Sequence, residues 1–231
     1  MSSPCWSGGR QMARGLVIFG TGQIAELANF YFANDSLYEV AGFTVDDAYA
    51  TATNFAGLPV VPFSQVMHHF PPRTHDLFVA IGYSKLNRLR VERFRDSLAL
   101  GYELASYLSS RATIWMPERI GRNCLVLEDN TVQPFVTIGD NCYLWSGNHV
   151  GHHSTVMEGT FIASQVVISG NVTVGRRCFL GVNATVRNGI SIGDECVIGA
   201  GAVIMHDTEP GGVYPGPEAT RIAVPSSRVR L

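Results

Sequence analysis

The second half of the chain carries an aliphatic residue at every sixth position, and the register never slips. All sixteen members of the series are isoleucine, leucine or valine: Ile114, Ile120, Val126, Val132, Ile138, Leu144, Val150, Val156, Ile162, Ile168, Val174, Leu180, Val186, Ile192, Ile198 and Ile204. A strict period of six is typical of hexapeptide β-helices, in which short strands stack coil on coil around one apolar core. The series therefore predicts an all-β parallel β-helix over residues 110–231.

The cysteines of this region indicate how many hexads make one coil. They all occupy the fifth position of a hexad, and the intervals between them are three, six and three hexads: Cys124, Cys142, Cys178 and Cys196. A coil of three hexads stacks them on one face, with Thr160 filling the gap. A stacked metal or redox site is one interpretation, but small side chains in a buried apolar slot is the interpretation that we favour.

Residues 15–109 show a different pattern, in which strands and helices alternate. Leu16–Phe19 is a short apolar run, followed by a glycine turn and a helical stretch over 23–33. Further strands are predicted over 39–45, 77–81 and 102–108, with an amphipathic helix over 85–98. Alternating strands and helices predict a small Rossmann-like α/β domain with a parallel sheet. Residues 1–14 are expected to form a flexible tail.

Composition narrows the classes of function. The chain has 231 residues, 46% of them hydrophobic and 16% charged, as in a globular protein, and its net charge of −2 gives no electrostatic footprint for nucleic acid. No apolar run reaches the roughly 18 residues that span a bilayer. Five cysteines without paired short spacing fit a reducing compartment. We expect a cytoplasmic protein that binds neither membrane nor nucleic acid.

The segment from Ile114 to about Arg221 resembles the hexapeptide-repeat acyltransferases, whose β-helix is left-handed. The whole chain is similar to the branch that contains sialic acid O-acetyltransferases and nucleotide-sugar N-acetyltransferases. The matching stretches of the first domain are Val17-Ile18-Phe19-Gly20-Thr21-Gly22, Gly42-Phe43-Thr44-Val45-Asp46-Asp47 and Val79-Ala80-Ile81-Gly82. The resemblance implies a homotrimer that uses acetyl-CoA, needs no metal and acts on a nucleotide sugar in surface-polysaccharide biosynthesis.

The resemblance also places the catalytic residues. Gly151-His152-His153-Ser154 matches the active-site segment of the family, so His152 is predicted to be the general base, a role that suits an imidazole near neutral pH. Gly170 follows three hexads later, one coil along, where the family uses a backbone N–H. The family usually has a carboxylate directly after the base, whereas this chain has His153. Glu158 or a residue of another subunit is a candidate to supply that carboxylate.

Further binding residues follow from the same resemblance. The backbone around Val182 and Ala200 is expected to contact the pantetheine arm of acetyl-CoA. Three arginines are candidates for its phosphates: Arg176, Arg177 and Arg187. The segment over 212–217 resembles the closing loop of the family, except that Glu218 separates Pro217 from the alanine that usually follows it. For the nucleotide sugar, the predicted contacts are Gly20, Thr21 and Gly22 at the phosphates, Asp46 and Asp47 at the base or ribose, and Gly82 at the cleft.

Two other functions fit parts of the pattern. His149-x-x-His152-His153 resembles a metal cluster, and some left-handed β-helix trimers are zinc-dependent hydratases of the γ-carbonic-anhydrase type. A non-catalytic nucleotide-sugar-binding protein would bind the sugar without consuming acetyl-CoA. The sequence favours an acetyltransferase acting on a sugar, most simply on the amino group of a nucleotide-linked amino sugar, and leaves O-acetylation, the sugar and the nucleotide open.

Overall fold

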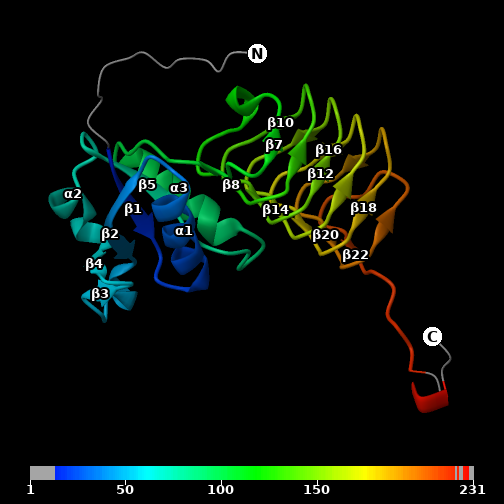
Figure 1. Cartoon of the computed structure of the whole chain (residues 1–231), viewed down its shortest axis with the longest axis horizontal. Coiled ribbons are helices and arrows are strands. Elements are labelled where there is room, and N and C mark those ends of the chain that lie inside the picture. The colour runs from blue at the N-terminus through cyan, green and yellow to red at the C-terminus, as the bar shows by residue number, and fades with distance from the viewer. Residues whose placement is uncertain (1–13, 222, 224–225, 229–231) are drawn as a thin grey trace.

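The computed structural model describes residues 14–221, 223 and 226–228. The first part is an α/β domain, and the second is a solenoid of stacked coils (Figure 1). Residues 1–13 of the expected tail lie outside the described residues. Arg14 is described, and its Nε forms a salt bridge with Asp76 at 2.6 Å.

The α/β domain holds a five-stranded sheet in the order β3-β4-β2-β1-β5. Strands β1, β2, β4 and β5 are parallel, and β3 pairs antiparallel with β4. The apolar strands β1 and β5 are buried between helices, as parallel strands normally are. The elements are β1 (Gly15–Phe19), α1 (Gln23–Asn34), β2 (Glu39–Val45), β3 (Asn54–Phe55), β4 (Leu58–Pro62), α2 (Val66–His69), β5 (His75–Val79) and α3 (Arg88–Ala99), with single 3-10 turns at Asp47–Tyr49 and Phe63–Gln65.

Two predicted elements of this domain need correction. The helix expected over 85–98 begins only at Arg88, because Lys85, Leu86 and Asn87 all have positive φ angles that no helix accommodates. The strand expected over 102–108 is wrong as a single element. Leu104 bridges to Leu77 of the α/β sheet, whereas β6 (Tyr107–Leu108) already belongs to the solenoid, just before residue 110.

The solenoid has three flat faces built from two-residue strands. Face I contains β10 (Thr137–Ile138), β13 (Thr155–Val156), β16 (Thr173–Val174) and β19 (Ser191–Ile192). Face II contains β6, β8 (Leu125–Val126), β11 (Tyr143–Leu144), β14 (Phe161–Ile162), β17 (Phe179–Leu180), β20 (Val197–Ile198) and β22 (Val213–Tyr214). Face III contains β7 (Thr113–Ile114), β9 (Thr131–Val132), β12 (His149–Val150), β15 (Val167–Ile168), β18 (Thr185–Val186) and β21 (Val203–Ile204).

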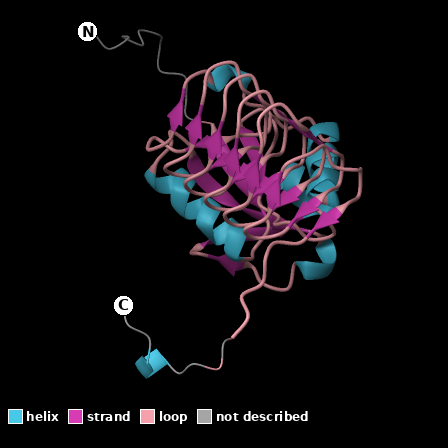
Figure 2. Cartoon of the chain, turned by 90° about the vertical axis from the view of Figure 1, so that its right-hand side faces the viewer, coloured by secondary structure: helices cyan, strands magenta, loops and turns pink. Residues whose placement is uncertain are grey.

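The stacking confirms the predicted fold. Every pairing on the three faces except that of β22 with β20 joins residues three hexads apart, as in Thr137 with Thr155, so one coil is three hexads. The aliphatic series points inward: Ile114 and Ile120 at the first coil are half-buried, and the later members are buried. The solenoid is the left-handed parallel β-helix that the sequence predicts. Figure 2 shows its short strands stacked in rows with helices beside them.

The chain passes from face II to face III to face I and back within each coil, so three columns of corners run along the solenoid. We name them by the faces they join. The II–III corner of the third coil is at 145–148, its III–I corner is at 151–154 and its I–II corner is at 157–160. The fourth hexad position, at the tip of each corner, has φ between 53° and 77° in every hexad from Asn123 to Gly201.

The α/β domain packs on face II. Aromatic and leucine side chains on the outside of that face join the core of the domain, and the rings of Phe78 and Tyr143 stack with centroids 5.8 Å apart. The Val79 amide at the end of β5 donates to Asn123 Oδ1 at 2.7 Å. Face II is therefore occupied by the chain's own first domain, and faces I and III are not.

Arg90 of α3 is completely buried in this interface. Its guanidinium donates to the carbonyl oxygens of Ile81 and Gly82 after β5, at 3.3 and 3.2 Å, and to those of Asn141 and Gly159 on the solenoid, at 3.2 and 3.0 Å. Its Cζ lies 4.2 Å from the ring centroid of Tyr143. No carboxylate pairs with it among the described residues, and burial lowers the pKa of the Arg90 guanidinium. Arg90 thus ties the loop after β5 to two coils.

Candidate active site

His152 and His153 lie at the III–I corner of the third coil, and both side chains are exposed. The corner is fixed from the coil before it. Gln133 Oε1 accepts the backbone N–H of His152 at 2.8 Å, and the Pro134 carbonyl oxygen accepts that of His153 at 3.4 Å. From the next coil, the Asn171 N–H donates to the carbonyl oxygen of His152 at 2.9 Å. The two imidazoles therefore stand on a backbone that is held from both sides.

The two nitrogens of the His152 ring have different surroundings. Its Nδ1 lies 3.1 Å from Nδ1 of His153, a hydrogen bond in which one ring donates and the other accepts. Its Nε2 faces Gly170 and has no hydrogen-bond partner in the described part of the chain. When His152 is the donor, Nε2 carries a lone pair. That tautomer is the one that a general base requires.

Gly170 is next to His152, one coil along the same corner. A Cβ built on Gly170 would lie 2.7 Å from Cε1 and 2.8 Å from Nε2 of His152, so only glycine leaves the imidazole in place. The amide N–H of Gly170 has no hydrogen-bond partner among the described residues. An open N–H beside a candidate base is the geometry that can stabilise an oxyanion.

The carboxylate candidate that the sequence suggested is elsewhere. Glu158 lies at the I–II corner, where its Oε1 accepts from Arg176 Nε at 2.9 Å. It does not contact His152, whose ring nitrogen is instead bonded to His153. Within the described part of the chain, the neighbour that orients His152 is therefore a second imidazole and not a carboxylate.

The other predicted acetyl-CoA residues are not on the corner of His152. Val182 and Ala200 are exposed and stacked on the II–III corner, where the Gly201 N–H donates to the Val182 carbonyl oxygen at 2.8 Å. Face III separates them from Gly170. Of the arginines, Arg176 and Arg177 lie at the I–II corner and pair with carboxylates there, and only Arg187 is on the III–I corner.

The predicted nucleotide-binding residues meet at the carboxyl ends of β1 and β5. Gly20 follows β1 with φ +121°, and a Cβ there would lie 2.9 Å from the Ala80 carbonyl oxygen. Gly22 is the N-cap of α1, and a Cβ on it would meet nothing within 4 Å. A Cβ on Gly82 would lie 3.7 Å from the Ile24 side chain. The amino end of α1, open and free of a side-chain cap, suits a phosphate.

Asp46 and Asp47, at the end of β2, already have partners within the domain. Asp46 forms a salt bridge with Arg93 at 2.8 Å. Asp47 Oδ1 accepts the backbone N–H of Ser64 at 3.1 Å, and the hydrogen bonds from Ser64 hold the pKa of the Asp47 carboxyl below its usual value. A ribose or base at this edge would share these carboxylates with Arg93 and Ser64.

The stacked cysteines are buried, and Thr160 fills the gap between them. The sequence predicted an apolar slot, but the slot also contains polar backbone groups. Each Sγ approaches a backbone carbonyl of the next coil, as Cys142 does that of Met157 at 3.1 Å, and the hydroxyls of Ser154 and Thr160 make the same contact to Ser169 and Gly175 at 3.0 and 2.9 Å. At the I–II corner, the fifth position of each hexad therefore holds a small side chain, cysteine or threonine, that can donate a hydrogen bond.

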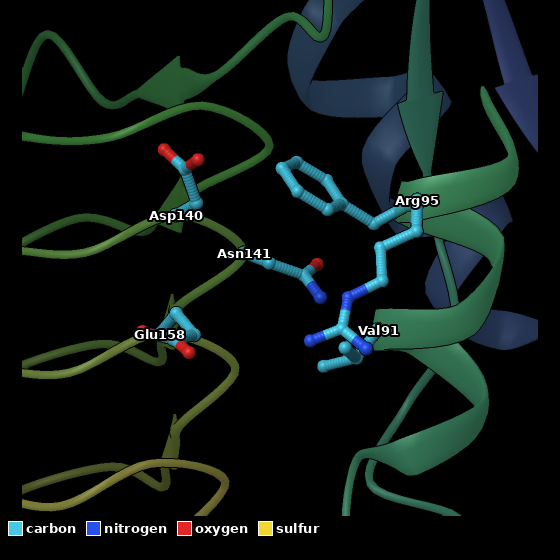
Figure 3. A pocket seen from close by; sticks show the side chains of 6 residues that line it. Val91, Arg95, Asp140, Asn141 and Glu158 are labelled. Atoms are coloured by element: carbon cyan, nitrogen blue, oxygen red, sulfur yellow. The ribbon is translucent and has the colours of Figure 1, made fainter. Parts of the chain in front are cut away.

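A cleft of about 240 Å³ lies between α3 and the solenoid corners, as Figure 3 shows. Val91 and Arg95 line it from the helix, and Asp140, Asn141 and Glu158 line it from the solenoid. Because it borders the I–II corner, it is on a different edge of the solenoid from His152. In residues 14–221 and the short described segments beyond them, no group of three or more His, Cys, Asp or Glu side chains is placed to hold a metal ion.

Sequence reasoning missed two residues next to the histidines. Gln133 holds the His152 backbone, and the ring of Phe135 lies against that of His153, with centroids 4.7 Å apart. Counting back one coil of three hexads from Gly151 and His153 leads directly to both. The signal was therefore present in the period itself.

Known families match parts of this fold. Residues 119–152 match the family described as bacterial transferase hexapeptide (six repeats), and residues 171–205 match the hexapeptide repeat of succinyl-transferase. No curated protein matches the chain.

Solved structures match nearly the whole chain. A mutant of the perosamine N-acetyltransferase from Caulobacter crescentus, in complex with CoA and GDP-perosamine, has a TM-score of 0.76 and 27% identity over 86% of this chain and 92% of its own. PerB from the same organism, in complex with the same two ligands, has a TM-score of 0.73 and 28% identity over 88% and 91%. The acetyltransferase domain of PglB from Neisseria gonorrhoeae has a TM-score of 0.74 and 25% identity over 87% and 95%.

The protein is an acyltransferase, and its repeats and fold are similar to those of the hexapeptide-repeat transferases. Within that class its whole-chain neighbours are acetyltransferases, among them an N-acetyltransferase in complex with a nucleotide sugar. No helix in the described residues is long and apolar enough to cross a membrane.

Proposed function

We propose that the protein transfers the acetyl group of acetyl-CoA to the amino group of a nucleotide-linked amino sugar, with His152 as the general base. The observation that carries this proposal is the environment of the His152 ring. Nδ1 is engaged by His153, Nε2 is free, and Nε2 faces a glycine whose own N–H is free. A base and an oxyanion donor side by side are the two groups that acyl transfer to an amine needs.

In the proposed reaction, the neutral amine of the sugar attacks the thioester carbonyl carbon. His152 Nε2 takes the proton that the nitrogen loses, while the Gly170 N–H donates to the carbonyl oxygen as it becomes an oxyanion. When the C–S bond breaks, His152 returns the proton to the CoA thiolate. His153 accepts from Nδ1 of His152 throughout, which keeps the lone pair on Nε2 at the start of each cycle.

The α/β domain is the proposed holder of the nucleotide sugar. The open amino end of α1, with Gly20, Thr21 and Gly22 before it and Gly82 beside it, is suited to the diphosphate. We assign Asp46 and Asp47 to the ribose or base. The complexes of the Caulobacter neighbours with CoA and GDP-perosamine support the same class of substrates for this chain.

We further propose that the active site lies between copies of the chain in a homotrimer. In a three-sided solenoid, the III–I corner is opposite face II, and face II is covered by the chain's own α/β domain. A sugar held by that domain is therefore remote from His152 of the same copy. The α/β domain of a neighbouring copy has to bring the acceptor, and the II–III corner with Val182 and Ala200 is free to contact acetyl-CoA from another subunit.

We place the protein in the cytoplasm, in the biosynthesis of a surface polysaccharide. Four unpaired, buried thiols in the described part of the chain fit a reducing compartment.

The test is a thiol-release assay with acetyl-CoA and a panel of UDP-, dTDP- and GDP-linked amino sugars. His152→Ala should lower kcat by about 10²–10⁴ and leave both dissociation constants nearly unchanged. His149→Ala, on face III just before the corner, is the matched control and should retain kcat. Loss of activity in His149→Ala with retention in His152→Ala would show that the base is misassigned.

Other outcomes distinguish the remaining functions. Binding of a nucleotide sugar without release of thiol indicates a non-catalytic binding protein, and stoichiometric zinc indicates a hydratase. For the shared site, mixed trimers of His152→Ala with a variant of the Gly20–Gly22 turn should regain part of the activity that each lacks alone. A monomeric mass at micromolar concentration by light scattering contradicts the two-copy site.

A further inference from the structure

Phe135 stands at a corner tip of the solenoid, and no other described tip from Asn123 to Gly201 carries a phenylalanine. It is at the tip of the III–I corner in the second coil, with φ +67°. Asn, Asp or Gly stands at most of the equivalent tips from Asn123 to Gly201, as expected where φ is positive. Phe135 and His153 carry the only ring side chains at these tips of the described chain, and they lie one coil apart on the same corner.

The two rings are in contact. Their centroids are 4.7 Å apart with an interplanar angle of 35°. The Phe135 N–H in turn points at the Met116 sulfur at 3.3 Å, which holds the backbone of this tip from the first coil. About half of the Phe135 residue surface remains exposed. Phe135 is a large apolar residue in a strained backbone conformation, and it is half exposed beside the two histidines of the candidate active site. Such a position is better explained by function than by packing.

The contacts form a chain that ends at the base. Phe135 lies against His153, His153 Nδ1 is 3.1 Å from His152 Nδ1, and His152 Nε2 faces Gly170. His153 needs such support because its side chain is exposed and, apart from its bond to His152, has no other hydrogen-bond partner among the described residues. A carboxylate offers two equivalent oxygens to a neighbouring imidazole. An imidazole offers one lone pair and must be held in one pose.

We propose that Phe135 is a positioning residue: it holds the His153 ring in the pose that keeps His152 in the tautomer with a bare Nε2. The inference rests on the proposed acetyltransferase function, in which His152 is the base. Without the ring of Phe135, His153 would sample three χ1 wells and two ring orientations, so roughly one pose in six would be productive. The expected loss in kcat is therefore about fivefold to tenfold.

The test compares Phe135→Asn, which installs the residue common at these tips, with the conservative Phe135→Tyr. Phe135→Asn should fold with an unfolding midpoint close to that of the unchanged protein, lose about fivefold to tenfold in kcat, and keep both KM values. Phe135→Tyr should restore kcat. Asp129→Asn installs the same residue at the preceding tip, on the II–III corner. It serves as the control and should change neither kcat nor the KM values.

A second measurement does not depend on turnover. ¹⁵N NMR of the imidazoles reports which nitrogen of His152 carries the proton. The unchanged protein and Phe135→Tyr should show Nδ1 protonated and Nε2 bare, whereas Phe135→Asn should show an averaged tautomer. An unchanged His152 spectrum together with an unchanged kcat in Phe135→Asn overturns the inference. A raised KM for the nucleotide sugar with full kcat also overturns it, since Phe135 would then contact the acceptor.

These outcomes are separate from failure of the proposed function. If the unchanged protein releases no thiol with any sugar of the panel, the acetyltransferase proposal fails, and the NMR comparison still decides whether Phe135 sets the pose of the histidine pair.

Discussion

Replacing Gly170 by alanine tests the core of the site with one methyl group. The added Cβ would lie 2.7 Å from Cε1 and 2.8 Å from Nε2 of His152, whereas ordinary contact begins near 3.4 Å. The imidazole must therefore move by roughly 0.7 Å. Because a misplacement of about 1 Å in a catalytic group can cost 10²-fold, we expect kcat to fall about 30- to 100-fold, or about 2–2.7 kcal/mol in the activation free energy.

The fold should tolerate this change. The φ angle of Gly170 is not in the left-handed region, so alanine fits the backbone and restricts the unfolded chain, which is worth about 0.4–1 kcal/mol of stability. Thermal unfolding should show a midpoint at or slightly above that of the unchanged protein. Steady-state thiol release gives kcat, and equilibrium binding of the nucleotide sugar should be unaffected.

A double-mutant cycle separates the contact with His152 from any effect on acetyl-CoA. In the His152→Ala background there is no ring to displace, so Gly170→Ala should cost less than about threefold there. Two results refute the reasoning. One is a kcat for Gly170→Ala within threefold of the unchanged protein, and the other is an equal loss in both backgrounds.

Two further predictions concern the interface and the core. Arg90→Met leaves the buried carbonyls of Asn141 and Gly159 without their donor, which costs about 1–3 kcal/mol for each carbonyl and is partly offset because a buried charge is removed. The free energy of unfolding should therefore fall by about 2–4 kcal/mol, and the unfolding midpoint should drop by roughly 4–16 °C. Arg95→Met, on the exposed side of the same helix, should stay within about 0.5 kcal/mol, and equal effects of the two would contradict the assignment. Burial raises the pKa of the Cys124 and Cys178 thiols to about 12, so these thiols should not react in the folded protein. In a Cys5→Ser background, an aromatic disulfide reagent at pH 8 should label the four core cysteines only after denaturation. Labelling of folded protein would show that the slot opens.

The period of six allowed the solenoid to be predicted almost completely. Ile114 to Ile204 determine which side chains point inward, and the spacing of Cys124 and Cys142 determines the size of the coil, because a stacked architecture repeats one local rule. His152 and Gly170 could be paired from their separation of three hexads for the same reason. The structure places them next to each other.

Residues that act across the repeats were not predictable in this way. Arg90 is one arginine among several on α3, and nothing in its spacing shows that it is the one that reaches carbonyls from both domains. Val182 and Ala200 share the period with Gly170, but the period does not tell which corner a residue occupies relative to a second copy. The slot of Cys142 was misread as apolar because a sequence does not show that a backbone carbonyl of the next coil lies beneath it.

The stacking also means that the length of the solenoid along its axis is set by the number of coils. His152, Gly170, Val182 and Ala200 occupy successive coils, and each coil advances the chain by one strand spacing of about 4.8 Å. In the proposed arrangement, the distance along the axis between His152 and the acetyl-CoA contacts at Val182 and Ala200 can change only by whole coils. Length variants of this protein should therefore differ by whole coils of three hexads, and the reach of the acyl carrier that each accepts should change in steps and not continuously.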